Sequence, residues 1–224
     1  MKARVLMLCL LLGGCASGGS STDPGRVPAA SSREVDVAVH ADLIRGMLAQ
    51  NNNYAALAHI QDQQRRTGNT AELRYLEAEA RRRLGQIAEA EALYRGLLRS
   101  DLSAQAYHGL GLLYATGNLG QSIVYLREAA KRRPTDADVR SDLGFALLRA
   151  GQYDASLAEL ATAVELDAAN TKARNNLLLL LMTTGDEAGV KRVAADTGID
   201  NPTLTRLRKQ AQSLRGAKAA GGVP

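Results

Sequence analysis

A spacing of 34 residues recurs along the chain. Gly117, Gly151 and Gly185 are each separated by 34 residues, and Leu143 and Leu177 are separated by the same distance. Within one such period, the apolar residues follow a helical pattern twice, with a break between the two stretches. This period predicts repeated helix–turn–helix units, each of which buries its apolar face only by stacking on the next unit.

The residues at equivalent places are small wherever two neighbouring helices would touch. Gly111 and Gly144 lie in the first helices of their units, and Ser122 and Ser156 lie early in the second helices. The glycine that closes each period falls where a first helix must end, because glycine adopts the left-handed conformation at low cost. The pattern resembles the tetratricopeptide repeat (TPR). We therefore expect an all-α fold, a right-handed superhelical solenoid of TPR helix pairs.

The composition agrees with a helical repeat protein. The 224 residues are 46% hydrophobic but only 4% aromatic, with no Trp and one Phe. Few aromatic residues suit close helix stacking and argue against a sheet protein. The formal charge of +5 falls to +3 once Lys2 and Arg4 are removed with the first fourteen residues. That charge is mild, so we expect no nucleic-acid role.

The N-terminal stretch has the organisation of a bacterial lipoprotein signal. Lys2 and Arg4 precede a short apolar run that ends in Leu12-Gly-Gly-Cys15. The run is far shorter than the ~20 residues that span a bilayer as a helix, so it is interpreted as a signal peptide. The ending resembles a lipobox, which implies lipidation of Cys15; a signal peptide with a chance cysteine is the alternative. Ala16, rather than Asp, favours the periplasmic face of the outer membrane in the lipoproteins that it resembles.

These features divide the chain into four parts. We expect a lipoprotein signal peptide at 1–14, then the lipidated Cys15 and a flexible Ser/Gly/Pro-rich tether over 15–33. We expect the solenoid at 34–215, with about five helix pairs and a closing helix, and a disordered tail at 216–224. The first helix is expected over 35–50, with Val39, Leu43, Met47 and Leu48 facing inward.

The sequence contains no catalytic or metal-binding constellation. His40, His59 and His108 are scattered, and no cysteine or paired carboxylate accompanies them at metal-ligand spacing. The basic runs at 81–83 and 131–133 are interpreted as solvated helix faces rather than a polyanion site. We expect neither an enzyme nor a cofactor, and the remaining candidate for function is a protein-binding surface.

In solenoids of this kind, the first helices of the units line a concave groove. Counting from the Leu-Gly pair of each unit places mainly apolar residues at its centre, which suits an apolar or amphipathic peptide segment. The alternative is that these residues only pack the superhelix or cover one another. The predicted partner-binding residues are Leu112, Phe145, Leu148, Asn175, Leu179 and Met182.

The lipobox, the tether and about five repeats together resemble the TadD-like lipoproteins of the tight-adherence (Tad/Flp) pilus system. The resemblance extends from Cys15 to about Leu214, and its most suggestive part runs from Lys172 to the closing helix. It implies a membrane-anchored module that helps the outer-membrane secretin, or another Tad component, to localise or assemble. Two alternatives remain: a pilotin-like lipoprotein of a type IV pilus or type II secretion system, and a scaffold for a periplasmic cell-wall enzyme.

Overall fold

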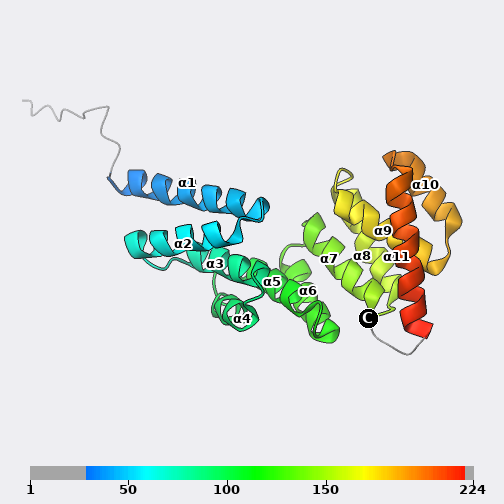
Figure 1. Cartoon of the computed structure of the whole chain (residues 1–224), viewed down its shortest axis with the longest axis horizontal. Coiled ribbons are helices and arrows are strands. Elements are labelled where there is room, and N and C mark those ends of the chain that lie inside the picture. The colour runs from blue at the N-terminus through cyan, green and yellow to red at the C-terminus, as the bar shows by residue number, and fades with distance from the viewer. Residues whose placement is uncertain (1–28, 220–224) are drawn as a thin grey trace, which may run out of the picture.

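The computed structural model describes residues 29–219, with side chains from 38 to 216. Over this range all regular structure is helical, which confirms the predicted all-α fold (Figure 1). Ten helices form five consecutive pairs, and an eleventh closes the stack. The pairs are α1 (Ala29–Ala49) with α2 (Asn53–Thr67), α3 (Ala71–Arg83) with α4 (Ile87–Gly96), α5 (Ser103–Tyr114) with α6 (Leu119–Arg132), α7 (Ala137–Arg149) with α8 (Tyr153–Leu166), and α9 (Thr171–Thr184) with α10 (Glu187–Thr197), followed by α11 (Asn201–Ala219).

The two helices of a pair approach closely at a glycine, as the spacing predicted. A Cβ atom on Gly144 would lie 2.5 Å from Leu160 Cγ. The buried Ser156 hydroxyl donates a hydrogen bond of 2.7 Å to the Gly144 carbonyl oxygen across the same contact. One repeat earlier, the Ser122 hydroxyl donates to the Gly111 carbonyl oxygen, also at 2.7 Å. The hydroxyl satisfies a carbonyl on the facing helix, so these helices can pack closely without leaving a buried polar group unpaired.

Side-chain caps start most of the first helices. The side chains of Thr70, Asp136 and Asn170 accept hydrogen bonds from the backbone N–H three residues later, at 3.0–3.2 Å. Each cap supplies an acceptor for one of the amide groups that has no partner within the helix. The caps therefore fix where α3, α7 and α9 begin.

Glycine ends three of the first helices in the left-handed region. Gly85, Gly151 and Gly185 have φ values of 74°, 71° and 84°. Gly117 does not have positive φ, so the expectation of a left-handed residue there is wrong. The reason is the shorter turn of this repeat, in which Gly117 follows Gly111 by one residue less than Gly151 follows Gly144.

The hydrophobic core continues along the stack and is largest at the C-terminal end. The apolar run from Leu177 to Met182 in α9 is buried throughout, as its all-round apolar character predicted. Leu207 and Ala211 of α11 pack into this cluster from outside the repeats. The closing helix therefore completes the core of the last pair.

The ends of the helical region differ from the predicted boundaries. Helix α1 begins at Ala29, inside the expected tether, and its first two residues, Ala29 and Ala30, are of the type with the highest helix preference. Helix α11 continues to Ala219, beyond the predicted end of the solenoid at residue 215. The predicted signal peptide, Cys15 and most of the tether lie outside the described residues. Among the described helices, none has both the length and the apolarity that a membrane crossing requires.

The inward face of α1 also differs from the prediction. Of the four residues predicted to face inward, Leu48 is buried and Met47 is partly buried, whereas Val39 and Leu43 are 60% and 47% exposed. Ala41 and Ile44 are buried instead. Both sets of residues have helical spacing, so the periodicity of α1 alone did not distinguish them. Packing against α2 and α3 selects the Ala41–Ile44–Leu48 stripe.

Candidate partner-binding surface

A ladder of polar side chains joins the first helices of the third, fourth and fifth pairs. His108 Nε2 of α5 lies 2.8 Å from Asp142 Oδ2 of α7. Lys172 Nζ of α9 lies 3.2 Å from the same Asp142 oxygen and 3.1 Å from Asp138 Oδ1. Asn170 Nδ2 donates to Asp138 Oδ1 at 3.1 Å. We call these five residues the polar ladder.

The polar ladder follows the repeat period. His108 and Asp142 are 34 residues apart, as are Asp138 and Lys172, so these two contacts join equivalent positions of successive first helices. The contacts of Lys172 with Asp142 and of Asn170 with Asp138 span 30 and 32 residues. Asp142 and His108 are mostly buried, with side chains 15% and 19% exposed, while Asp138 is 61% exposed. The ladder therefore has a fixed inner part and an outer part that solvent or a partner can reach.

Neighbouring groups in the ladder shift the pKa values of Lys172 and Asp138 in favour of their charged forms. Burial would lower the pKa of the Lys172 ammonium, but Asp142 and Asp138 outweigh that effect and raise the pKa above its ordinary value. Burial would likewise raise the pKa of Asp138, but hydrogen bonds from Asn170 and Lys172 lower it. Both groups are therefore charged at neutral pH, and they present fixed charges to a bound chain.

The structure divides the six predicted partner-binding residues into two groups. Leu148, Leu179 and Met182 are only 2%, 1% and 3% exposed, so they belong to the core and are not open to a partner. The other three, Leu112, Phe145 and Asn175, are partly exposed on α5, α7 and α9. The expectation of an apolar groove centre is thus corrected for α9, and what remains accessible there is polar.

The closing helix is the physical reason for this correction. Leu207 and Ala211 of α11 pack against the apolar run of α9 that contains Leu179 and Met182. Arg215 Nη1 of α11 also donates a hydrogen bond of 3.1 Å to the Met182 carbonyl oxygen. Helix α11 therefore covers the part of α9 that a segment in the groove would otherwise contact.

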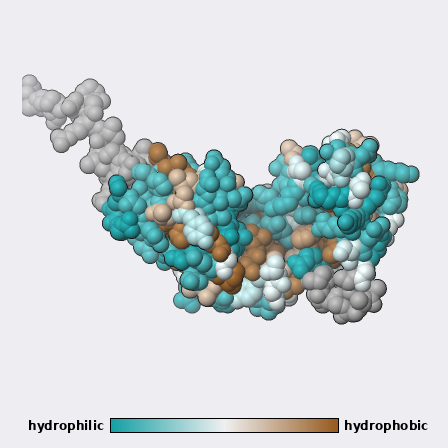
Figure 2. Space-filling view, in the orientation of Figure 1, coloured by the Kyte–Doolittle hydropathy of each residue, from teal (hydrophilic) through white to brown (hydrophobic). Residues whose placement is uncertain are grey.

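Apolar side chains reach the surface at the other end of the stack. Val39 and Leu43 of α1 are one helical turn apart and exposed, and Tyr54 at the start of α2 is 77% exposed. The space-filling view shows apolar residues over this N-terminal half, and an indentation between the two ends of the molecule (Figure 2). Sequence reasoning missed this exposure because it assigned Val39 and Leu43 to the core.

The described residues contain no group of three or more His, Cys, Asp or Glu side chains placed to hold a metal ion. What the surface offers is a row of fixed charges, hydrogen-bonding groups and half-buried apolar side chains on successive helices. The fold and this surface define a class of protein, the helical-repeat scaffolds that bind other proteins.

Comparison with known proteins identifies the family. A family model described as "Tetratricopeptide repeat" matches residues 113–199. A TPR repeat-containing protein of Pseudomonas aeruginosa is 32% identical over 227 residues, which cover 100% of this chain and 90% of that protein. The chain therefore belongs to the tetratricopeptide-repeat family.

Solved structures share the fold at lower identity. A thermophilic TPR protein of Thermus thermophilus matches with a TM-score of 0.63 and 20% identity, covering 79% of this chain and 97% of that one. The pilF protein of Pseudomonas aeruginosa matches with a TM-score of 0.64 and 18% identity, covering 83% and 90%. YrrB, described as a TPR protein with an unusual peptide-binding site, matches with a TM-score of 0.55 and 18% identity, covering 76% and 90%. At these identities the likeness concerns the fold alone.

Proposed function

We propose that this TPR protein is a lipid-anchored module on the periplasmic face of the outer membrane. There it helps the secretin of a Tad/Flp pilus system to localise or assemble. The observation that supports this proposal is the presence, in one chain, of a lipobox-like Leu12-Gly-Gly-Cys15 and a TPR solenoid. The lipid on Cys15 holds the module at the membrane, and the solenoid binds a segment of the secretin or of another assembly component.

The accessible first-helix surface supports the binding part of the proposal. Lys172 and Asp138 are 45% and 61% exposed at the outer end of the polar ladder, and Phe145 is half-buried about two helical turns further along α7 from Asp138. A segment laid across α5, α7 and α9 meets an apolar ring and charges of both signs within one surface. Such a mixture binds through shape and charge complementarity rather than through apolar area alone.

The membrane anchor is tested in a strain that lacks the gene and carries wild type, Cys15→Ser or the matched control Ser20→Ala. We expect wild type and Ser20→Ala to fractionate with the outer membrane and to restore secretin multimers. Cys15→Ser should leave the membrane fraction and restore multimers poorly, because a soluble module is diluted away from its partner. Normal multimers in the deletion strain itself would overturn the proposed client.

The binding surface is tested in the same strain with Lys172→Glu. The substitution places a third carboxylate beside Asp138 and Asp142, so it reverses the charge of the outer ladder. We expect this variant to remain in the outer membrane but to restore fewer multimers than wild type. Lys191→Glu, at an exposed position of α10, serves as the charge-matched control. Full restoration by Lys172→Glu would exclude the outer ladder from partner binding.

A further inference from the structure

The closing helix α11 carries charge of a single sign. Between Asn201 and Ala219 the sequence has five Lys and Arg residues and no Asp or Glu. These residues are Arg206, Arg208, Lys209, Arg215 and Lys218. The formal charge of the whole chain is +5, so this one helix supplies as much positive charge as the chain has in excess.

The basic residues of α11 lie on the sides that do not serve the core. Leu207 and Ala211 are buried against α9. The exposed cations are Arg206, Arg208, Lys209 and Arg215. Helix α11 lies on the outside of the C-terminal end of the stack (Figure 1), and the surface at that end is mostly hydrophilic (Figure 2). The outer face of α11 is therefore open to a partner.

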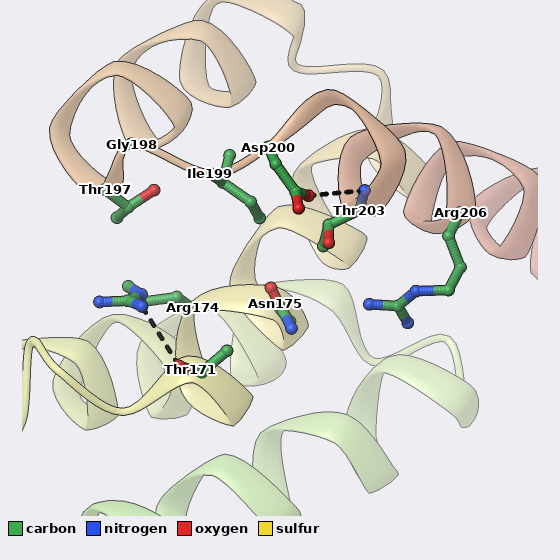
Figure 3. A pocket seen from close by; sticks show the side chains of 9 residues that line it. All are labelled: Thr171, Arg174, Asn175, Thr197, Gly198, Ile199, Asp200, Thr203 and Arg206. Atoms are coloured by element: carbon green, nitrogen blue, oxygen red, sulfur yellow. Dashed lines mark hydrogen bonds between the residues drawn. The ribbon is translucent and has the colours of Figure 1, made fainter.

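Carboxylates do little to neutralise this outer face. Arg208 Nη2 lies 3.9 Å from Glu187 Oε2, and both side chains are more than half exposed. Arg206 and Lys209 form no ion pair with another described residue. Figure 3 shows Arg206 apart from Asp200, whose carboxylate caps α11 by accepting a hydrogen bond of 2.8 Å from a backbone N–H. The positive charge of the outer face thus remains available.

Neither the helix nor the core requires this charge. Before α10, most Arg and Lys side chains of the described residues pair with a carboxylate. Arg206 and Lys209 are three residues apart, and neighbouring like charges destabilise a helix. They also lie outside the last turn, where the helix dipole favours cations. A closing helix needs a polar outer face, which charges of both signs would supply equally well.

We propose that the outer face of α11 binds an anionic phospholipid surface. The inference rests on the proposed membrane anchor, and it adds a second contact with the same membrane. Clusters of about 4–8 Lys and Arg residues on a helix attract anionic headgroups. An acidic protein fits this face less well, because the centres of protein interfaces are depleted in Lys and rely on aromatic anchors. Helix α11 contains no aromatic residue.

The two contacts involve opposite ends of the stack. Cys15 precedes α1, whereas α11 follows the last pair (Figure 1). A lipid on Cys15 alone leaves the solenoid free to turn, and a second contact through α11 restricts how it lies on the membrane. Stable anchoring takes two signals. The basic face alone therefore binds reversibly, and Cys15→Ser is still expected to leave the membrane fraction.

The test isolates α11 from the lipid. The chain of residues 15–224 with Cys15→Ser retains every described helix and has no lipidation site. This parent protein is sedimented with vesicles of phosphatidylcholine alone, or of phosphatidylcholine mixed with phosphatidylglycerol. We expect binding to the mixed vesicles, little binding to the neutral ones, and release at high salt, because salt screens exposed charges.

Two double variants distinguish the face of α11 from net charge. Arg208→Gln with Lys209→Gln should weaken binding to the mixed vesicles about twentyfold, since each cation near an anionic surface contributes about fivefold. Arg127→Gln with Lys131→Gln is the matched control, because it removes two exposed cations from α6 and changes the net charge equally. It should bind as the parent does. Circular dichroism of each variant separates lost binding from lost folding.

Equal binding to neutral and mixed vesicles, or an equal loss in the two double variants, would overturn the α11 proposal. Binding to polyglutamate without binding to the mixed vesicles would also overturn it, in favour of an acidic protein. The proposed function fails separately. If the mixed vesicles do not bind while Cys15→Ser still removes the protein from the membrane in cells, only the α11 proposal fails. If they bind while multimers are normal in the deletion strain, only the pilus client fails.

Discussion

Replacement of Gly144 by alanine tests the close contact between α7 and α8. The new Cβ would lie 2.5 Å from Leu160 Cγ, 2.7 Å from Leu160 Cδ2 and 3.3 Å from the Leu160 backbone nitrogen. Leu160 is fully buried at 0% exposure, so its side chain has no open space to enter. Helix α8 is also held in place, because the Ser156 hydroxyl is bonded to the Gly144 carbonyl oxygen. The two helices must therefore move apart to admit one methyl group.

Two opposing effects determine how much Gly144→Ala changes the free energy of unfolding. Alanine is better than glycine in a helix interior by about 1 kcal/mol. Overpacking of a close core contact costs about 1–3 kcal/mol, and a contact this short belongs at the upper end of that range. The expected net loss of unfolding free energy is about 1–2 kcal/mol. For a chain of this length, that corresponds to a fall in Tm of about 2–8 °C. Gly144→Leu adds more atoms at the same contact and should cost more.

The assay is thermal and urea unfolding followed by far-UV circular dichroism, with Gly46→Ala as the matched control. Gly46 is an exposed residue of α1 with no atom that a Cβ would meet within 4 Å. That substitution should raise stability by about 0.5–1 kcal/mol, because only the helix preference operates. The two glycines should therefore respond with opposite signs. A Gly144→Ala protein as stable as Gly46→Ala would refute the packing argument.

Three further effects should be measurable by urea unfolding. Ser156→Ala removes the buried hydrogen bond to the Gly144 carbonyl oxygen and should cost about 1–2 kcal/mol, with a similar loss for Ser122→Ala in the preceding repeat. Tyr94→Phe removes the hydroxyl that donates to the buried Glu79 carboxylate and should cost about 1–3 kcal/mol; no loss would mean that water replaces the donor. Burial raises the pKa of Glu79, but Arg82 outweighs it and the pKa lies below its ordinary value. The stability that Glu79 contributes should thus be present above about pH 4.3, be lost as the pH falls through the lower folded-state pKa, and be absent in Glu79→Gln.

The helix pairs were predictable because the contacts between helices recur with the same 34-residue period as the sequence. Each pair must contact the next at the same place, so the small residues recur at the contact and the glycines recur at the turn. Gly111, Gly144, Ser122 and Ser156 were all placed at helix contacts from spacing alone, and the structure confirms their burial. The all-round apolar run in α9 was predicted to be buried for a related reason, since no face of it could meet water.

The structure differs from the sequence predictions where the 34-residue period ends, and where one helix has two apolar stripes of helical spacing. Helix α11 follows the last repeat, so no spacing indicated that Leu207 and Ala211 would cover Leu179 and Met182. In α1 the Val39–Leu43 stripe and the Ala41–Ile44–Leu48 stripe both fit a helical period. Only the position of the neighbouring helices decides between such stripes. These are contacts between segments, and periodicity within one segment carries no information about them.

The same reasoning shows why the candidate site was harder to predict than the fold. His108 and Asp142 are 34 residues apart, as are Asp138 and Lys172, so these offsets were already visible in the sequence. Their mutual contacts depend on how far each first helix is displaced from the next, which the period does not specify. The accessible surface of a solenoid consists of side chains that stacking does not require, so they are free to be polar. Partner choice in this protein is therefore expected to depend on the exposed outer part of the polar ladder, Asp138 and Lys172.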